Sequence, residues 1–298
     1  MLYFLQQIAN AVPIAALYAA LAFGYAIAFA VTRRADLTYG ALFAFAGQMF
    51  VLFANFGWNQ LWLVLPVALG LGAAAGLTLG VGAGLVAGRY VMRPLAFSSA
   101  NTVVVASLGC LLVLMETARL ASETKSLWLP PFLNGNIVFW SDAKFPVTLT
   151  VIQLLNTLLM VALVASGHWF LAHSRAGRSW RAVSEDRGAA ALCGIDAARV
   201  YIAAYGAASL IAACCGILAA SYYGNMDFGT GLTFGVKVLF IAAIGGQTSP
   251  LCAALGAAAI GLLETLWGAY GPILWRDFAI FGFLVIVLAV TRQEKIIP

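Results

Sequence analysis

The sequence predicts an all-α, polytopic membrane protein, and three observations lead to that fold class. Of its 298 residues, 63% are apolar and 9% are charged, whereas a soluble domain has about half apolar and a quarter charged residues. The mean hydropathy is +0.96. The apolar residues occur in runs of about 20, the length that an α-helix needs to cross a hydrocarbon core of about 30 Å. We therefore expect roughly eight to ten transmembrane helices and exclude a soluble enzyme, a disordered chain and a disulfide-stapled secreted module.

Apolar runs bounded by charged residues, Pro or Gly give the expected elements in chain order. Five runs, 8–31, 37–56, 61–88, 102–121 and 146–172, precede a polar segment at 175–196. Four runs follow it, at 200–222, 236–246, 250–270 and 274–291. The run 236–246 is too short to cross a bilayer as a regular helix and has glycines at its boundaries. We expect a half-helix or re-entrant segment there, which must be covered by protein or line a cavity. The whole chain, 1–298, is predicted to be a single transmembrane domain.

The distribution of Lys and Arg over alternate loops predicts the orientation. It places eleven basic residues, including Arg33 and Arg34, on one side and five, including Lys237 and Arg276, on the other. The richer side is expected to be cytoplasmic. The polar segment 175–196 and the C-terminus then lie in the cytoplasm, and 122–145 forms an extracytoplasmic loop. The start of the chain lacks the positive charge of a cleaved signal peptide, so the first run is expected to stay in the membrane.

The third run has a glycine at every fourth position, which puts all of these glycines on one helical face. They are Gly72, Gly76, Gly80, Gly84 and Gly88. Small residues at this spacing let another helix approach closely, which matters in a membrane because association there gains no hydrophobic free energy. We interpret the stripe as a helix-packing surface. Helix sliding during a transport cycle is the alternative.

Charged residues within or beside the apolar runs are candidate functional groups, because an ionisable side chain in hydrocarbon is costly. They are Glu116 with Arg119, Lys237, Glu264, and Arg276 with Asp277. Glu116 and Arg119 are three residues apart on one helix and are expected to pair. Glu264 has no close partner in the sequence. We expect it either to support a broken helix by hydrogen bonding or to contact substrate.

The sequence contains no motif for metal binding, redox chemistry or catalysis. The five cysteines form no C-x-x-C pair, and the two histidines have no cysteine or carboxylate cluster beside them. No H-E-x-x-H or G-x-S-x-G motif occurs, so no catalytic residue and no metal site is expected. The basic residues are dispersed without interleaved aromatic residues, so nucleic acid is not an expected partner.

The segment 175–196 is expected to form a short cytoplasmic helix. Ser184, Glu185 and Asp186 are capping and acidic residues suited to a helix start, and Gly194 is suited to a helix end. The small residues 188–191 give this helix a smooth face that fits the groove of another protein. A solvated, positively charged loop is the alternative interpretation.

Three motifs resemble those of the Liv-type permeases of branched-chain amino acid ABC transporters, and of their relatives for urea, short amides and sugars, over nearly the whole chain. The first is Gly-Arg-Ser-Trp-Arg-Ala-Val-Ser-Glu-Asp at 177–186, which continues to Gly194-Ile195. The second is Ala-Ile-Gly-Gly-Gln-Thr-Ser at 243–249, followed by Glu264, and the third is Arg93-Pro94 with the run to Leu108-Gly109. The turn from Asp36 to Gly40, together with Thr248 and Cys252, departs from the family pattern. These departures leave the substrate open.

The resemblance implies an inner-membrane permease with two halves of inverted topology, in which 33–47 and 245–259 are the candidate corresponding segments. The charge count, however, puts the turns of both segments on the cytoplasmic side. The residues expected to couple to an ATPase are Arg178, Arg181, Glu185, Asp186, Ala190, Gly194 and Ile195. Those expected along the translocation path are Asp36, Tyr39, Gly40, Gly245, Gly246, Ser249 and Glu264.

The resemblance also implies partners. They are a homologous second permease in a heterodimer, two ATPase subunits that bind ATP and Mg²⁺, an extracytoplasmic substrate-binding protein, and the lipid bilayer. The chain lacks a G-x-x-x-x-G-K-[ST] phosphate loop, so no cofactor is expected on it and it is not expected to be an enzyme. Branched-chain or related hydrophobic amino acids are the implied substrates. Urea, amides or aromatic carboxylates are alternatives, and so is an ion-coupled secondary transporter that uses Glu264 and Glu116.

Overall fold

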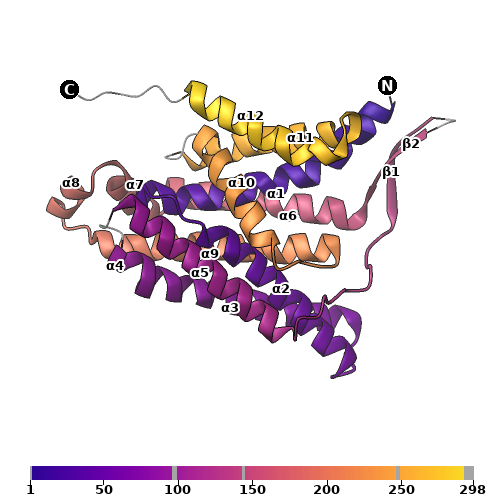
Figure 1. Ribbon diagram of the computed structural model, residues 1–298, viewed down its shortest axis with the longest axis horizontal. Helices are drawn as coiled ribbons and strands as arrows, with labels where there is room; N and C mark the ends of the chain where they lie inside the picture. The colour runs from indigo at the N-terminus through magenta and orange to yellow at the C-terminus, as the bar shows by residue number, and fades with distance from the viewer. Residues whose placement is uncertain (1, 96–98, 143–144, 246–248, 292–298) are drawn as a thin grey trace.

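The computed structural model describes residues 2–95, 99–142, 145–245 and 249–291, and these residues are mostly helical (Figure 1). Seven helices of this described part are long and apolar enough to span a membrane. They are α1 (Leu2–Thr32), α2 (Thr38–Asn59), α3 (Leu65–Val86), α5 (Ala100–Ala121), α6 (Val151–His173), α9 (Ala197–Tyr223) and α11 (Pro250–Tyr270). The predicted fold class, an all-α polytopic membrane protein, is confirmed. The count of eight to ten spans stays a prediction.

Two further apolar helices are shorter. α10 (Thr230–Gly245) and α12 (Arg276–Thr291) have 16 residues each, which corresponds to about 24 Å of helix. The run expected to be a half-helix or re-entrant segment is thus a short helix, α10, which begins before residue 236; its course in the membrane stays a prediction. Figure 1 shows α10 inclined to α1 and α2, and it packs against both α2 and α11.

The buried side chains come mainly from α1, α2 and α9, whereas few residues of α3, α5 and α6 are fully buried. Along α1 runs α11, which is antiparallel to it. Tyr3 at the start of α1 meets Tyr270 at the end of α11, and a Cβ on Gly261 would lie 2.7 Å from Ala15 Cα. The end of α1 at Thr32 and the start of α11 at Pro250 therefore lie at the same end of the bundle.

The glycine stripe of α3 faces α2 and α9. A Cβ on Gly72 would lie 2.6 Å from the carbonyl oxygen of Phe50, and one on Gly76 would lie 2.8 Å from that of Ala46. The contacts with α9 are also close, since Gly80 faces Ala213 and Gly84 faces Ser209. The last glycine of the stripe, Gly88, lies after α3 in the π-helical turn η1 (Ala87–Met92) and faces the ring of Tyr205. A side chain at any of these positions would push α3 away from the helices that it contacts.

The two ends of the bundle carry different elements. One end carries α7 (Arg175–Glu185) and α8 (Arg187–Leu192), and the opposite end carries the antiparallel hairpin of β1 (Asn136–Asp142) and β2 (Phe145–Thr150) (Figure 1). We call them the coupling end and the hairpin end. After η1, the short α4 (Arg93–Leu95) lies at the coupling end, and η2 (Ile273–Trp275) precedes α12 at the hairpin end.

The hairpin is an unpredicted element in and beside the loop expected at 122–145. Its run of β-branched and aromatic residues at 137–140 is typical of a strand. The Gln6 side chain of α1 pairs with the backbone of Thr148, accepting at 2.8 Å and donating at 2.9 Å. The hairpin is thereby attached to the start of α1.

The structure corrects two expectations drawn from the loops. Arg33 donates to the Ser184 carbonyl at 2.8 Å, so the turn after α1 lies at the coupling end, and α11 begins at that end as well. Segments 33–47 and 245–259 therefore do not correspond in an inverted repeat, because inverted segments would start at opposite ends; the repeat itself stays a prediction. Lys237, counted as a loop residue, is instead buried within α10.

Candidate functional site

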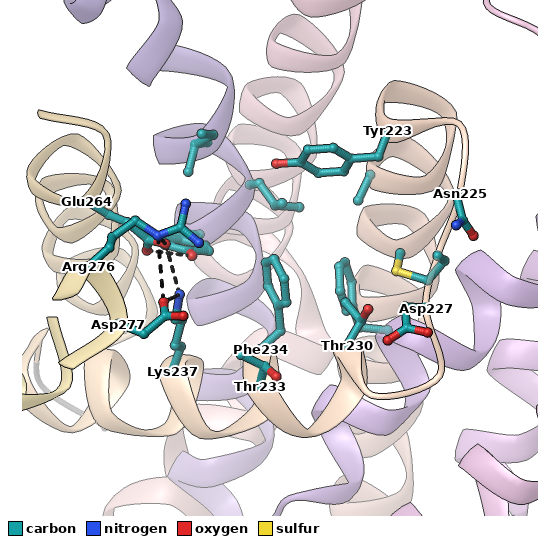
Figure 2. Close-up of a pocket in the computed structure, with 16 residues that line it drawn as sticks. Tyr223, Asn225, Asp227, Thr230, Thr233, Phe234, Lys237, Glu264, Arg276 and Asp277 are labelled. Atoms are coloured by element: carbon teal, nitrogen blue, oxygen red, sulfur yellow. Dashed lines mark hydrogen bonds and ion pairs between the residues drawn. The ribbon is translucent and has the colours of Figure 1, made fainter. Parts of the chain in front are cut away.

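A cavity of about 360 Å³ lies in the half of the bundle nearer the hairpin end, with α10 as one of its walls (Figure 2). Side chains from α1, α2, α9, α10, α11 and α12 line it. Its apolar lining includes Ile14, Leu17, Phe43, Met226 and Phe234. The cavity therefore combines an apolar wall with the polar groups described next.

Lys237, Glu264, Arg276 and Asp277 gather at one end of this cavity and are called the charged cluster here (Figure 2). Lys237 Nζ lies 2.9 Å from Oε1 of Glu264 and 3.1 Å from Oδ1 of Asp277. The Tyr18 hydroxyl donates to Oε2 of Glu264 at 2.7 Å. Helices α1, α10, α11 and α12 thus meet through these side chains.

These charges can remain inside the bundle because the positive and negative side chains pair with one another. Lys237 and Glu264 are buried, and a buried ion is tolerated only when partners replace the water that it loses. Arg276 differs from them. Its Nε is 3.8 Å from Glu264 and 3.7 Å from Asp277, beyond hydrogen-bond distance, and this buried nitrogen has no hydrogen-bond partner within the described chain.

Asp36 and Tyr39 form a separate group at the coupling end. The Asp36 carboxylate accepts from the backbone N–H of Thr38, the first residue of α2, at 2.8 Å, and from the Tyr205 hydroxyl, also at 2.8 Å. Burial raises the pKa of the Asp36 carboxyl. The Tyr39 ring meets Tyr25 edge-on, with centroids 5.7 Å apart. Neither Asp36 nor Tyr39 lines the cavity that Glu264 lines.

The other residues predicted along the path have different places. Gly40 contacts Gly235 so closely that a Cβ would overlap it, which brings α10 against α2. Gly245 is the last residue of α10, and Ser249 directly precedes α11, while Gly246 lies outside the described residues. Among the predicted path residues with a described position, Glu264 is the one that lines the cavity.

Reasoning from the sequence singled out Lys237, Arg276 and Asp277 as charges in or beside apolar runs, but did not place them with Glu264. It missed Tyr18 altogether. The available signal was charge balance, because isolated ions in a membrane need partners. Charge balance requires that each buried ion have a partner, but it does not say which residue that partner is.

α7 and α8 form the second candidate site and are attached to the last turns of α1. Trp180 Nε1 donates to the Ile27 carbonyl at 3.0 Å, and Arg187 donates to the Val31 carbonyl at 3.0 Å. Arg33 adds its hydrogen bond to Ser184 in the opposite direction. Val31 is among the last four residues of α1, whose carbonyls have no partner within the helix. The bond from Arg187 therefore gives the Val31 carbonyl a donor, and together these bonds hold α7 and α8 against α1.

The segment 175–196 contains two short helices where one was expected. Ser174 caps α7 by accepting from Gly177 N at 2.9 Å, and Asp186 caps α8 by accepting from Gly188 N at 2.7 Å. Gly194 follows α8 with φ of +78°, a conformation that suits glycine. The signals at Asp186 and Gly194 thus fall at the bounds of α8.

The residues expected to couple to an ATPase divide into two sets. Arg178 and Arg181 donate to carbonyls at the end of α6, at 3.3 Å to His173 and 2.9 Å to Ala172. Ala190 is buried and Ile195 is half-buried. Arg178 and Arg181 are exposed despite these bonds, and so are Glu185, Asp186 and Gly194 as well as Leu192, the last being 92% exposed. Leu192 is a surface feature that the predicted set had left out.

A bundle of apolar helices that encloses a charged cavity, with short helices attached at one end, has the form of a membrane transport subunit. Residues 7–289 match the family described as branched-chain amino acid transport system / permease component, and the chain belongs to that family. It is accordingly a multi-pass protein of the bacterial inner membrane.

Several curated proteins are similar over nearly the whole chain. The high-affinity branched-chain amino acid transport system permease protein LivH of Salmonella typhimurium is 27% identical, covering 97% of this chain and 94% of its own. BraD of Pseudomonas aeruginosa, which has the same description, is 24% identical, covering 96% and 93%. The autoinducer 2 import system permease protein LsrC of Enterobacter sp. strain 638 is 26% identical, covering 92% and 86%. No solved structure matches this chain.

Proposed function

We propose that this chain is a permease subunit of an ATP-driven importer and forms half of the translocation path for branched-chain or related hydrophobic amino acids. The substrate class is supported by LivH and BraD, whose descriptions name branched-chain amino acids. LsrC is an import permease for a different compound. Substrate identity therefore has to be argued from the lining of the cavity as well as from the family.

The observation that carries this proposal is the attachment of α7 and α8 to the end of α1. A permease driven by a separate ATPase needs an exposed surface for that subunit and a stiff connection to its own helices. Glu185, Asp186, Leu192 and Gly194 provide the exposed surface. The hydrogen bonds of Trp180, Arg187 and Arg33 provide the connection.

Movement at the coupling end reaches the cavity through α1. This helix is buried along most of its length, packs along α11, and carries Tyr18, which is bonded to Glu264. Displacement of α7 and α8 by a closing ATPase would tilt α1 as a rigid body and open or close the cavity. The close contact of Gly40 with Gly235 seals α10 against α2 in the present arrangement.

The proposed assembly contains a homologous second permease and two ATPase subunits, on which ATP and Mg²⁺ are bound. A substrate-binding protein delivers the amino acid at the hairpin end, outside the cell. In this arrangement the chain itself binds no nucleotide. Most of the selection between substrates falls to the binding protein, and the permease provides a path.

An ion-coupled secondary transporter is less well supported by the charges in the helices. Such a carrier needs a carboxylate that binds the coupling ion. Glu116 pairs with Arg119 on the exposed side of α5, at 2.9 Å from its Nε. Glu264 pairs with Lys237 and Tyr18. Both carboxylates considered for this role are therefore already neutralised.

Copurification tests the proposed coupling surface. We expect an ATPase subunit expressed from the same operon to copurify with the wild-type chain and to be reduced at least about tenfold by Leu192→Asp, because a charge replaces an apolar contact. Leu133→Asp is the matched control, since Leu133 is exposed in the loop that precedes the hairpin. Loss with both variants, or with neither, would contradict the assignment of α8 as the docking element.

A further inference from the structure

We propose that the cavity beside α10 binds a zwitterionic α-amino acid, with Arg276 holding the carboxylate, Asp277 holding the ammonium group, and the apolar side chain lying along α10 against Phe234. This inference rests on the proposed import function and adds the chemistry of substrate recognition. It assigns specificity to a pair of residues that reasoning from the sequence did not place in the path.

Arg276 and Asp277 are the more exposed members of the charged cluster, although Asp277 also accepts a hydrogen bond from Lys237. Their side chains are 41% and 55% exposed, whereas those of Lys237 and Glu264 are 4% and 9% exposed and bind each other. Arg276 Nε and Asp277 Oδ1 are 3.7 Å apart, too far for a hydrogen bond. Arg276 Nε therefore has no hydrogen-bond partner within the described residues, and Asp277, whose Oδ1 accepts from Lys237 at 3.1 Å, has its second carboxylate oxygen left for a ligand.

The spacing of these two charges matches the head group of an amino acid. A zwitterion carries its carboxylate and its ammonium group on the same carbon, so it needs a cation and an anion side by side. Arg276 and Asp277 are adjacent in sequence, and both line the cavity. The guanidinium group can bind a carboxylate through two parallel hydrogen bonds, and a carboxylate such as Asp277 accepts from an ammonium group.

An apolar wall begins next to the charged cluster. Phe234 lies one helical turn before Lys237 on α10, and Figure 2 shows it between Lys237 and Thr230. Ile14, Leu17 and Phe43 line the same cavity. A volume of about 360 Å³ falls within the usual range of small-molecule sites, roughly 300–1,000 Å³. An aliphatic side chain therefore has an apolar surface beside its head group.

The same geometry discriminates against the other substrates considered for this family. Urea, amides and sugars carry no ion pair, and an aromatic carboxylate carries no ammonium group, so each would leave Arg276 or Asp277 without the bond that an amino acid supplies. A site that forms hydrogen bonds with the polar groups of its substrate rejects analogues that lack those groups. The cavity is thus complementary to an amino acid with an apolar side chain.

The test is equilibrium binding of tritiated leucine to the purified full chain in lipid nanodiscs. We expect saturable binding by the wild type, and affinity at least about tenfold lower in Arg276→Gln and in Asp277→Asn, the size expected for one lost charge-assisted hydrogen bond. Asp277→Glu should retain most of the affinity. 4-Methylpentanoate, which lacks the ammonium group, and 3-methylbutylamine, which lacks the carboxylate, should displace leucine poorly.

Arg119→Gln and Glu123→Gln are matched controls, because they remove the same kinds of charge from exposed positions outside the cavity. They should bind leucine as the wild type does. The inference is overturned if the wild type shows no saturable binding, if Arg276→Gln and Asp277→Asn bind normally, or if either analogue competes as well as leucine. ATP-dependent import of leucine by the complete assembly would still support the proposed function in each of these cases.

Discussion

At the scale of single residues, the principal feature is a buried lysine held between two carboxylates from other helices. Lys237 contacts Glu264, which is 27 residues away in the sequence, and Asp277, which is 40 residues away. A lone ammonium group at this depth would lose its hydration without compensation. The cluster therefore ties α10 to α11 and α12, and its integrity can be measured as stability.

We predict that Lys237→Met destabilises the protein by about 3–5 kcal/mol, because it takes the closest cation away from the buried Glu264 carboxylate. The double variant Lys237→Met/Glu264→Gln should recover part of that loss. Thermal unfolding in detergent, analysed as a double-mutant cycle, measures the coupling. Lys125→Met, at an exposed pair, should change stability by less than about 1 kcal/mol. Additive effects of Lys237 and Glu264 would show that the pair is not coupled.

Asp36 gives a prediction about pH. Its carboxyl has a pKa raised by burial above the ordinary value of 3.8, so the folded protein holds this proton more tightly than the unfolded chain does. The stabilisation associated with that proton is complete below about pH 4 and is lost as the pH rises through the folded-state pKa. The midpoint of thermal unfolding of the wild type should therefore fall relative to that of Asp36→Asn as the pH increases, because asparagine does not titrate. A difference independent of pH would argue against a buried, titrating Asp36.

At the scale of elements, α3 offers a matched comparison between glycines of one helix. Gly76 faces α2 at a distance that leaves no room for a Cβ, whereas Gly82 has nothing within 4 Å. Gly76→Ala should destabilise by about 1–3 kcal/mol through overpacking, and Gly82→Ala should be neutral or slightly stabilising because alanine favours helix. Thermal unfolding of the two variants distinguishes packing from propensity. Equal effects would mean that α3 does not pack through its glycine stripe.

The elements that could be predicted are those whose cause is local. Long apolar runs predicted the spanning helices, and the short run before Gly245 predicted the short α10. The hairpin was missed because the loop 122–145 was interpreted by its charge and its Pro, Trp and Asn content, not by the strand propensity of residues 137–140. The observed helix bounds differ from the predicted ones where a capping residue divides a polar segment, as Asp186 divides 175–196 into α7 and α8.

The candidate site could be predicted only in part, because its contacts are long-range. Glu264 was recognised as a carboxylate in an apolar run, yet its partner Tyr18 is 246 residues away and has no unusual sequence context. Gly40 was predicted along the path from its motif, and the structure shows it packed against Gly235. A motif thus locates a functional region without distinguishing residues that line a cavity from residues that pack beside it.

At the scale of the whole molecule, α1 connects the two candidate sites. Its last turns hold α7 and α8 through Ile27 and Val31, its middle carries Tyr18 at the charged cluster, and its start is attached to the hairpin through Gln6. A force applied at the coupling end therefore has a continuous path of packed and hydrogen-bonded groups to the cavity. In the proposed mechanism that force comes from ATP hydrolysis by another subunit.

The most direct test is uptake of tritiated leucine by proteoliposomes that contain this chain, its partner permease and the ATPase subunits, with the loaded binding protein outside. We predict uptake with ATP and Mg²⁺ on the ATPase side, and none when ATP is replaced by a non-hydrolysable analogue or when the ATPase subunits are omitted. Leucine uptake by this chain alone, driven by an ion gradient without ATP, would contradict the account and identify a secondary transporter.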